Sequence, residues 1–193
     1  LTGIGIFVAT LSSTGQARDA ITVRVNQPGA EIQPTMWGVF FEDINMGADG
    51  GIYAELVKNR SFEFAKPLMG WSVYQKQFVE GAVLVHNRPD NKTNPRFIRV
   101  TANNVAKGNL GITNEGFRGM GIKKGLRYDF SVMYKQASTG LKMHIDLIDS
   151  TKKVIGSTTL IPSGIGDWKK QSVSFNATET NPKAKMSIWF EGT

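Results

Sequence analysis

The chain contains no cysteine, which excludes a disulfide framework, a thiolate metal site and a cysteine nucleophile. Only two of the 193 residues are histidines, and no spacing of His, Asp and Glu indicates a metal site. No apolar run reaches the roughly 18 residues that a membrane-spanning helix needs. The basic residues stand singly or in pairs, such as Lys123-Lys124, which argues against a nucleic-acid-binding arm. The sequence therefore predicts no cofactor, no metal, no nucleic-acid partner and no membrane partner.

The first residues form a short apolar run, Ile4–Leu11, followed by small and polar residues up to Ala17. This order is typical of the hydrophobic region and cleavage site of a secretory signal peptide. The positively charged region that normally comes first is missing. We expect residues 1–17 to be a partial signal peptide and the protein to be secreted or periplasmic. The alternative is an N-terminal strand or tail.

Charge divides the rest of the chain into two parts. Residues 1–66 carry 5 basic and 7 acidic side chains, whereas residues 67–193 carry 18 basic and 9 acidic side chains. Such asymmetry indicates two structural units. For the basic part, a solvated surface is the simple interpretation, and attraction to an acidic polymer is the alternative.

The pattern in residues 18–66 predicts the beginning of a parallel α/β domain. Ile21–Val25 alternates apolar and polar residues, as a half-buried strand does. Met36–Phe41 is a continuous apolar run, as expected of a strand buried on both faces. A polar, glycine-rich loop follows, and from residue 52 apolar residues recur four apart, which predicts an amphipathic helix. Strand, loop and helix make one βα unit, which needs further units to bury its faces.

After Pro67 the hydrophobic period changes to two, and turn residues separate the segments. Seven or more short strands of this kind predict an antiparallel β-sandwich. The predicted fold class is therefore mainly β: a jelly-roll sandwich over residues 67–193, lacking its last strand, preceded by one βα unit of an incomplete TIM barrel. The expected strands are Ala82–His86, Phe97–Thr101, Tyr128–Lys135, Leu141–Ile148, Val154–Leu160, Lys170–Phe175 and Met186–Phe190.

Two sets of motifs resemble known families. Gly38–Asn45, Gly50–Glu55 and Asn59–Glu63 resemble the start of the catalytic domain in glycoside hydrolase family 51 α-L-arabinofuranosidases, closest to a secreted subgroup with an inserted sandwich. The later part resembles carbohydrate-binding modules of the family 4/9 type. The residues that carry this second resemblance are Gly70-Trp71, Asn114–Gly119, Gly125–Ser131 and Asp167–Lys170.

The first resemblance implies a retaining glycosidase, which needs two carboxyl groups roughly 5–5.5 Å apart. In the family both are glutamates on later barrel strands, so no catalytic residue is expected in this chain. Glu42 matches the family glutamate that binds the arabinose hydroxyls at the end of the first barrel strand. A helix-capping or loop carboxylate is the alternative. Asn114-Glu115 imitates the family's acid/base pair, but it lies within the sandwich pattern and is not expected to be catalytic.

Three tryptophans of the sandwich are candidates for stacking on sugar rings. Trp71 and Trp168 open strands, where such residues more often seal the core. Side chains alternate between the two faces of a strand, so Trp189 faces away from Met186, Ile188 and Phe190 and shares its face with polar residues. An aromatic side chain on a polar face is a candidate sugar platform, and a second buried layer is the alternative.

The resulting hypothesis is the N-terminal part of a secreted α-L-arabinofuranosidase that releases terminal arabinofuranosyl groups from arabinan or arabinoxylan. The expected partner is thus an arabinose-containing plant polysaccharide, and the resemblance also makes homo-oligomeric assembly of the full-length protein plausible. The alternative is a non-catalytic carbohydrate-binding or structural sandwich. Charged residues of the first motif, Glu55, Arg60 and Glu63, are expected to form structural ion pairs.

Overall fold

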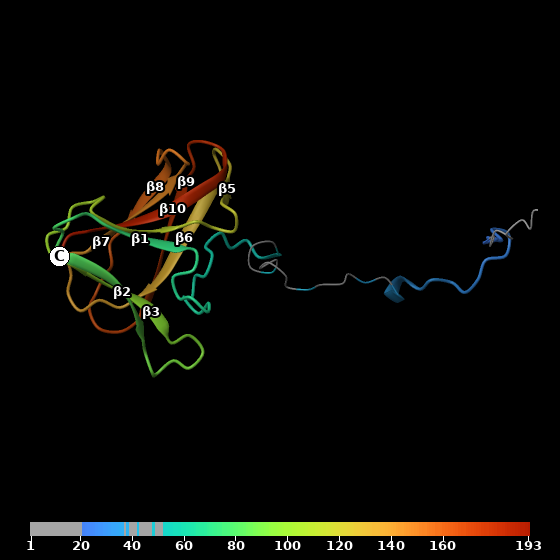
Figure 1. Cartoon of the computed structure of the whole chain (residues 1–193), viewed down its shortest axis with the longest axis horizontal. Coiled ribbons are helices and arrows are strands. Elements are labelled where there is room, and N and C mark those ends of the chain that lie inside the picture. The colour runs from blue at the N-terminus through green and yellow to red at the C-terminus, as the bar shows by residue number, and fades with distance from the viewer. Residues whose placement is uncertain (1–20, 37, 39–41, 43–47, 49–51) are drawn as a thin grey trace, which may run out of the picture. The chain divides into compact units, whose positions relative to one another are not determined.

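The computed structural model describes residues 21–36, 38, 42, 48 and 52–193 (Figure 1). The chain divides into two compact units, residues 1–41 and 42–193. In the described part of the first unit, the regular structure consists of one 3-10 helix, η1, Pro34–Met36. The prediction of a strand at Ile21–Val25 was wrong, because these residues form no ladder, and Ile21 and Val25 are 94% and 90% exposed. A strand needs a neighbour for its backbone N–H and C=O groups, and the described residues of this unit supply none.

The helix predicted from residue 52 is not formed over residues 53–57, which have bend and loop conformations. Ile52 and Tyr53 are mostly exposed, whereas Leu56 and Val57 pack against the core of the sandwich. A short amphipathic helix is unstable in water unless a surface covers its apolar face. Here Leu56 and Val57 are partly buried against the sandwich although the segment does not form a helix. Most of the strand expected at Met36–Phe41 lies outside the described residues, as does Trp37.

The second unit contains the antiparallel β-sandwich, which confirms the predicted mainly-β class (Figure 1). One layer is a six-stranded sheet with the order β1-β4-β10-β7-β8, in which β5 also pairs with β10. Its eleven-residue strand β10 hydrogen-bonds with β4 on one side and β7 on the other. The strands of this layer are β1 Trp71–Gln75, β4 Leu110–Asn114, β5 Met120–Ile122, β7 Lys142–Ile148, β8 Val154–Leu160 and β10 Asn181–Glu191.

Two antiparallel pairs cover the apolar face of this sheet. β2 (Gly81–Asn87) pairs with β3 (Arg96–Ala102), and β6 (Arg127–Tyr134) pairs with β9 (Lys169–Asn176). Partly buried residues of both pairs pack onto the core, among them Ile98, Val100, Phe130, Val132, Val173 and Phe175. The centre of the core is fully closed to solvent: Leu110, Ile145, Ile155, Leu160 and Ala184 are 0% exposed.

Two buried asparagines fix the irregular segment before β1: Asn114 of β4 attaches it to the sandwich, and Asn59 holds it together internally. The Asn114 side chain accepts from the Lys58 N–H at 3.0 Å and donates to the Lys58 carbonyl at 2.9 Å. Asn59 is 3% exposed, and its amide donates to the carbonyls of Pro67 and Met69. These bonds take the place of a strand ladder, because they satisfy backbone groups that have no partner strand. The segment that carries the motif Asn59–Glu63 is therefore fixed on the sandwich.

Candidate functional site

The residues predicted from the first motif lie in very different settings. Glu42 is exposed, and its neighbours Asp43 and Asn45 lie outside the described residues. Glu55 lies 3.6 Å from Arg60, and Glu63 forms an ion pair with Arg96 in β3 and accepts from its backbone N–H at 2.8 Å. These contacts confirm the prediction of structural ion pairs.

Glu115 lies directly after β4 in the sandwich. Its carboxylate is 2.8 Å from the Lys58 ammonium, and its side chain is 53% exposed. Asn114 before it is fully buried and binds backbone groups on both sides. The Asn-Glu pair thus has a structural setting that explains both residues without any catalytic role.

Trp71 belongs to the core. Its indole N–H donates to the Asn59 carbonyl at 3.1 Å, and its ring packs on Phe62 with a centroid separation of 5.5 Å. The ring also contacts the buried core residues. Of the two interpretations of Trp71, the structure therefore supports the core role.

Trp189 lies on the face of the six-stranded sheet that is turned away from the core, which we call the outer face. The alternation in β10 produces this arrangement, because Met186, Ile188 and Phe190 are buried in the core and their neighbours point the other way. The strand registers place one row of residues across the whole outer face: Tyr74 of β1, Gly111 of β4, Trp189 of β10, His144 of β7 and Thr159 of β8.

The indole of Trp189 lies over β4 because residue 111 is glycine. A Cβ at Gly111 would come within 2.6 Å of both the Trp189 ring atom Cε3 and the Ile188 carbonyl oxygen. On the far side of the strand, Tyr74 meets the indole edge-to-face, with ring centroids 5.6 Å apart. Edge-to-face aromatic pairs are favourable, so the ring is held in place from two directions. Trp189 remains partly exposed and offers an aromatic surface.

Polar side chains beside the indole form one hydrogen-bonded group. Glu191 accepts from the Lys142 ammonium at 2.9 Å and pairs with His144 Nε2 at 2.7 Å. The hydrogen bond from Lys142, followed by that from His144, lowers the pKa of Glu191 below its usual 4.5. Because the ionised carboxylate can only accept, His144 Nε2 carries the proton, and Nδ1 at 3.0 Å from the Thr159 hydroxyl completes the chain of bonds.

A second row on the outer face is more deeply buried. Asp146 is 2% exposed, 3.2 Å from the Lys107 ammonium and 2.6 Å from the Ser157 hydroxyl. Ser187 is also buried and shares a hydrogen bond of 2.9 Å with Thr113. The described residues contain no cluster of acidic and histidine side chains that could hold a metal. Asp146 and Ser187 are thus buried polar residues in the row next to the aromatic surface.

Trp168 lies in a different place, just before β9. Its ring meets Phe97 of β3 edge-to-face at 5.6 Å, and the guanidinium of Arg88 stands 4.5 Å from the ring centroid. The three candidate tryptophans are thus not brought together: one is in the core, one on the outer face and one against β3. Tyr74, Gly111 and Arg88 were missed from the sequence, because their roles depend on strand register and on contacts between distant segments.

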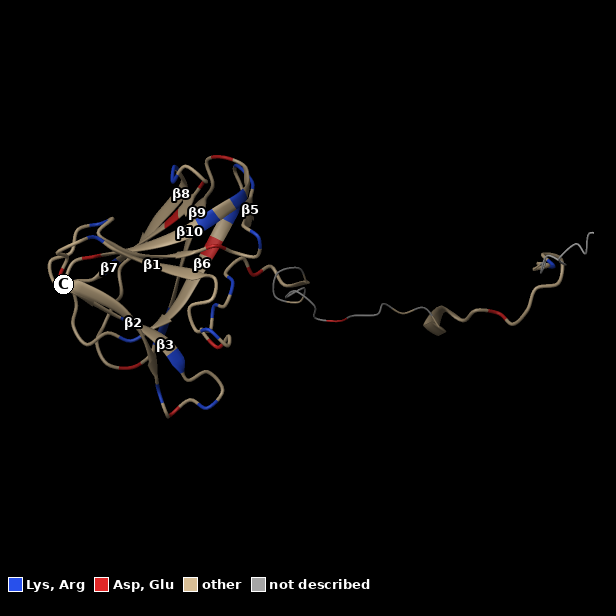
Figure 2. Ribbon diagram, in the orientation of Figure 1, with Lys and Arg blue, Asp and Glu red and all other residues tan. Residues whose placement is uncertain are grey.

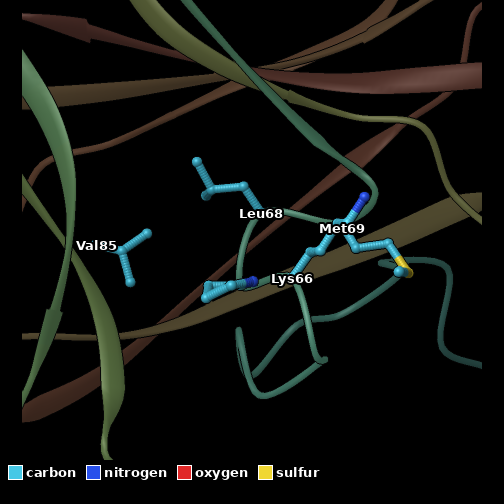
Figure 3. Close-up of a pocket in the computed structure, with 5 residues that line it drawn as sticks. Lys66, Leu68, Met69 and Val85 are labelled. Carbon is cyan, nitrogen blue, oxygen red and sulfur yellow. The ribbon is translucent and has the colours of Figure 1, made fainter.

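An apolar opening of about 570 Å³ lies between the segment before β1 and strand β2. It is lined by Lys66, Pro67, Leu68, Met69 and Val85, and Figure 3 shows Leu68 and Val85 facing the same opening. Lys66 is its single titratable group, so the opening offers little for acid–base chemistry. No helix among the described residues is long and apolar enough to cross a membrane.

Comparison with known proteins gives a consistent result. No family model matches the chain. An extracellular exo-α-L-arabinofuranosidase of Streptomyces chartreusis is 34% identical over 92% of this chain and 21% of its own length. α-L-Arabinofuranosidase 1 of Arabidopsis thaliana is 27% identical over 89% of this chain and 27% of its own length. The chain thus resembles α-L-arabinofuranosidases over nearly all of its length but spans only about a fifth to a quarter of these relatives.

Solved structures show the same fold. An arabinose-bound family 51 α-L-arabinofuranosidase superposes with a TM-score of 0.66 at 22% identity, over 78% of this chain and 26% of that chain. The enzymatically active domain of a bacteriophage CBA120 tailspike protein superposes with a TM-score of 0.53 at 13% identity, over 71% of this chain. At such low identities both likenesses concern the sandwich fold and not a shared activity.

Proposed function

We propose that this chain is part of a secreted, retaining α-L-arabinofuranosidase that releases terminal arabinofuranosyl groups from plant polysaccharides such as arabinan and arabinoxylan. The observation that carries this proposal is the 34% identity to an extracellular exo-α-L-arabinofuranosidase over 92% of the chain. The match includes both the first motif and the sandwich, so it is not a likeness between isolated turns. The apolar run Ile4–Leu11 supports secretion.

The 193-residue chain by itself is proposed to be inactive. A retaining glycosidase needs a nucleophile and an acid/base roughly 5–5.5 Å apart. The acidic residues Glu55, Glu63 and Glu115 are instead each paired with a basic residue at or near the sandwich. Purified chain should therefore release no p-nitrophenol from p-nitrophenyl α-L-arabinofuranoside above the buffer rate. Measurable turnover that copurifies with the chain would overturn this proposal.

Glu42 is proposed to bind the hydroxyls of the arabinofuranosyl group. A carboxylate can accept two charge-assisted hydrogen bonds from vicinal hydroxyls and thereby fix the ring orientation. In a longer protein that is active, Glu42→Gln should lower kcat/KM by more than about tenfold, equivalent to roughly 1.4 kcal/mol of transition-state binding. Glu31→Gln, an exposed carboxylate in the other unit, is the matched control and should leave kcat/KM unchanged. An unchanged kcat/KM in Glu42→Gln would refute the role.

A second candidate function is carbohydrate binding by the outer face of the sandwich. The specific observation in its favour is the aromatic surface of Trp189 beside the hydrogen-bonded group of Glu191, Lys142 and His144. Sugars present an apolar C–H face and a rim of hydroxyls, and binding sites of this kind combine apolar and aromatic surface with a few oriented polar groups. The surface would serve to hold the enzyme on its polymer.

Affinity electrophoresis in gels containing arabinan or arabinoxylan tests this second function. The chain should be retarded, and Trp189→Ala should lose most of the retardation, whereas Trp168→Ala should keep it because Trp168 lies away from the outer face. Equal behaviour of the wild-type chain and Trp189→Ala in every neutral polymer would leave the sandwich with a structural role.

A further inference from the structure

Arg88 is held in a fixed position but has no acceptor for its guanidinium. Its backbone N–H donates to the Pro95 carbonyl at 2.8 Å, which extends the β2–β3 hairpin by one bond. Its side chain lies over the Trp168 ring, with 4.5 Å between the guanidinium carbon and the ring centroid. Among the described residues, no carboxylate or carbonyl accepts a hydrogen bond from the Arg88 side chain. Stacking on an aromatic face leaves the N–H donors at the guanidinium edge available.

The aromatic support under Arg88 is itself well fixed. Trp168 meets Phe97 edge-to-face at 5.6 Å, and Phe97 stacks on His86 at 5.8 Å. The loop before Trp168 is tied to β6, because the Ser163 N–H donates to the Tyr134 hydroxyl at 2.9 Å. A guanidinium placed over such a support loses little side-chain entropy when it binds an anion.

The charge around Arg88 favours an anionic ligand. Residues 67–193 carry 18 basic and 9 acidic side chains. Lys and Arg occur along the β2–β3 hairpin and its connecting loop, where Arg88, Lys92 and Arg99 lie (Figure 2). Asp90, two residues after Arg88, and Asp167, next to Trp168, are both exposed, and neither forms an ion pair with Arg88. A planar guanidinium binds a carboxylate through two parallel hydrogen bonds.

We propose that Arg88 and Trp168 form a binding site for a carboxylate-bearing sugar, so that the sandwich recognises polysaccharides that contain uronic acid. Arg88 forms the paired hydrogen bonds with the uronate carboxylate, and the partly exposed edge of the aromatic cluster contacts the sugar ring. A polymer of phosphates is less suitable, because the site has one fixed arginine and not the row of basic side chains that tracks a nucleic-acid backbone.

Binding of the 193-residue chain to polygalacturonate tests this proposal, with fully methyl-esterified polygalacturonate as the uncharged counterpart. The chain should bind the acid polymer, and the affinity should fall with added salt. Arg88→Gln should weaken binding at least tenfold, since it removes a charge-assisted pair. Arg88→Lys, which keeps the charge but not the planar fork, should recover only part of the affinity, and Trp168→Ala should weaken binding as well.

The matched control is Arg118→Gln, because Arg118 is an exposed arginine in the turn between β4 and β5 and its loss changes the net charge equally. This control should weaken binding by less than about threefold, as expected from a loss of general attraction alone. The proposal fails if Arg88→Gln and Arg118→Gln weaken binding equally, if the methyl-esterified polymer binds as well as the acid, or if single-stranded DNA competes as well as polygalacturonate. Because hydrolysis is not measured, none of these results depends on the proposed arabinofuranosidase activity.

Discussion

Replacement of Asn114 by alanine should destabilise the sandwich far more than replacement of its neighbour Glu115. The Asn114 side chain is 0% exposed and serves three backbone groups. It accepts from the N–H groups of Lys58 and Gly116 at 3.0 Å each, and it donates to the Lys58 carbonyl at 2.9 Å. Alanine leaves all three groups without this partner in a region from which water is largely excluded.

The magnitude follows from the cost of unsatisfied groups. At roughly 1 kcal/mol for each of three groups, the lower end of the usual range, Asn114→Ala should cost about 3 kcal/mol in the free energy of unfolding. That is a large share of the roughly 5–15 kcal/mol by which a domain is stable. Asn114→Asp should not restore the loss, because its carboxylate keeps an acceptor but cannot donate to the Lys58 carbonyl and would be buried.

Equilibrium unfolding in urea, followed by tryptophan fluorescence, measures the effect. Glu115→Gln is the control: it removes an exposed ion pair with Lys58 and should cost only about 0–1 kcal/mol. The reasoning is refuted if Asn114→Ala lies within about 1 kcal/mol of the wild-type chain, or if both variants lose the same stability. A clear separation would show that Asn114 stabilises the sandwich through its buried hydrogen bonds, whereas Glu115 contributes little.

Three further predictions concern the sheet. Gly111→Val should displace the indole above it, change the near-ultraviolet circular dichroism and cost about 1–3 kcal/mol, as overpacking does; an unchanged spectrum would contradict the stated geometry. The hydrogen bond from Lys142 lowers the pKa of Glu191, so the ionised carboxylate stabilises the fold above the unfolded pKa, and this contribution is lost as the pH falls through the lower folded pKa. Melting temperatures should thus fall less steeply below pH 4.5 in Glu191→Gln than in the wild-type chain, and parallel curves would be inconsistent with this assignment. Leu110→Ala, at a fully buried position, should cost about 2–5 kcal/mol, whereas Leu84→Ala, at a position that is 57% exposed, should cost much less in the same urea titration.

Alternation of apolar and polar residues was sufficient to find most of the sandwich. All seven expected strands are present: Val154–Leu160 has the expected bounds, and the ends of the others differ by at most one residue, apart from the start of β10. The strands that were not specified were short or irregular in composition. β5 has three residues, and β4 contains Gly111. Among the strands that were expected, β10 begins earlier than Met186, with Asn181-Pro182, a dipeptide that normally indicates a turn.

The elements before the sandwich could not be predicted from local pattern, since their conformation depends on partners. Ile21–Val25 alternates correctly, but an alternating segment forms a strand only beside another strand. Leu56 and Val57 have helical spacing, yet their burial against the sandwich is achieved in a loop whose backbone is held by Asn114 and Asn59. Buried asparagines that replace a ladder have no periodic signature in a sequence.

The outer face was predictable only in part, for the same reason. The alternation of side chains along β10 places Trp189 and Glu191 on one face, and this placement could be predicted from the sequence. Tyr74 lies more than a hundred residues earlier in the chain, in β1. It meets Trp189 because both residues are in register with Gly111 of β4, and this register is known only from the structure. The Arg88–Trp168 contact joins a hairpin to a loop in the same way. Local alternation thus determines which side a residue faces, whereas register determines which residues meet.

Strand β10 makes core stability and the outer face depend on one register. Its alternate residues serve the two sides: Ile188 and Phe190 fill the core, while Trp189 and Glu191 form the outer face. A slip of one residue would exchange the two sets and would bury a carboxylate in an apolar core, at a cost of several kcal/mol. Pairing with β4 and β7 on both edges opposes such a slip. The position of the indole relative to His144 is therefore fixed by the packing on the opposite side of the strand, and substitutions in the core that loosen β10 should disturb the outer face without touching any residue on it.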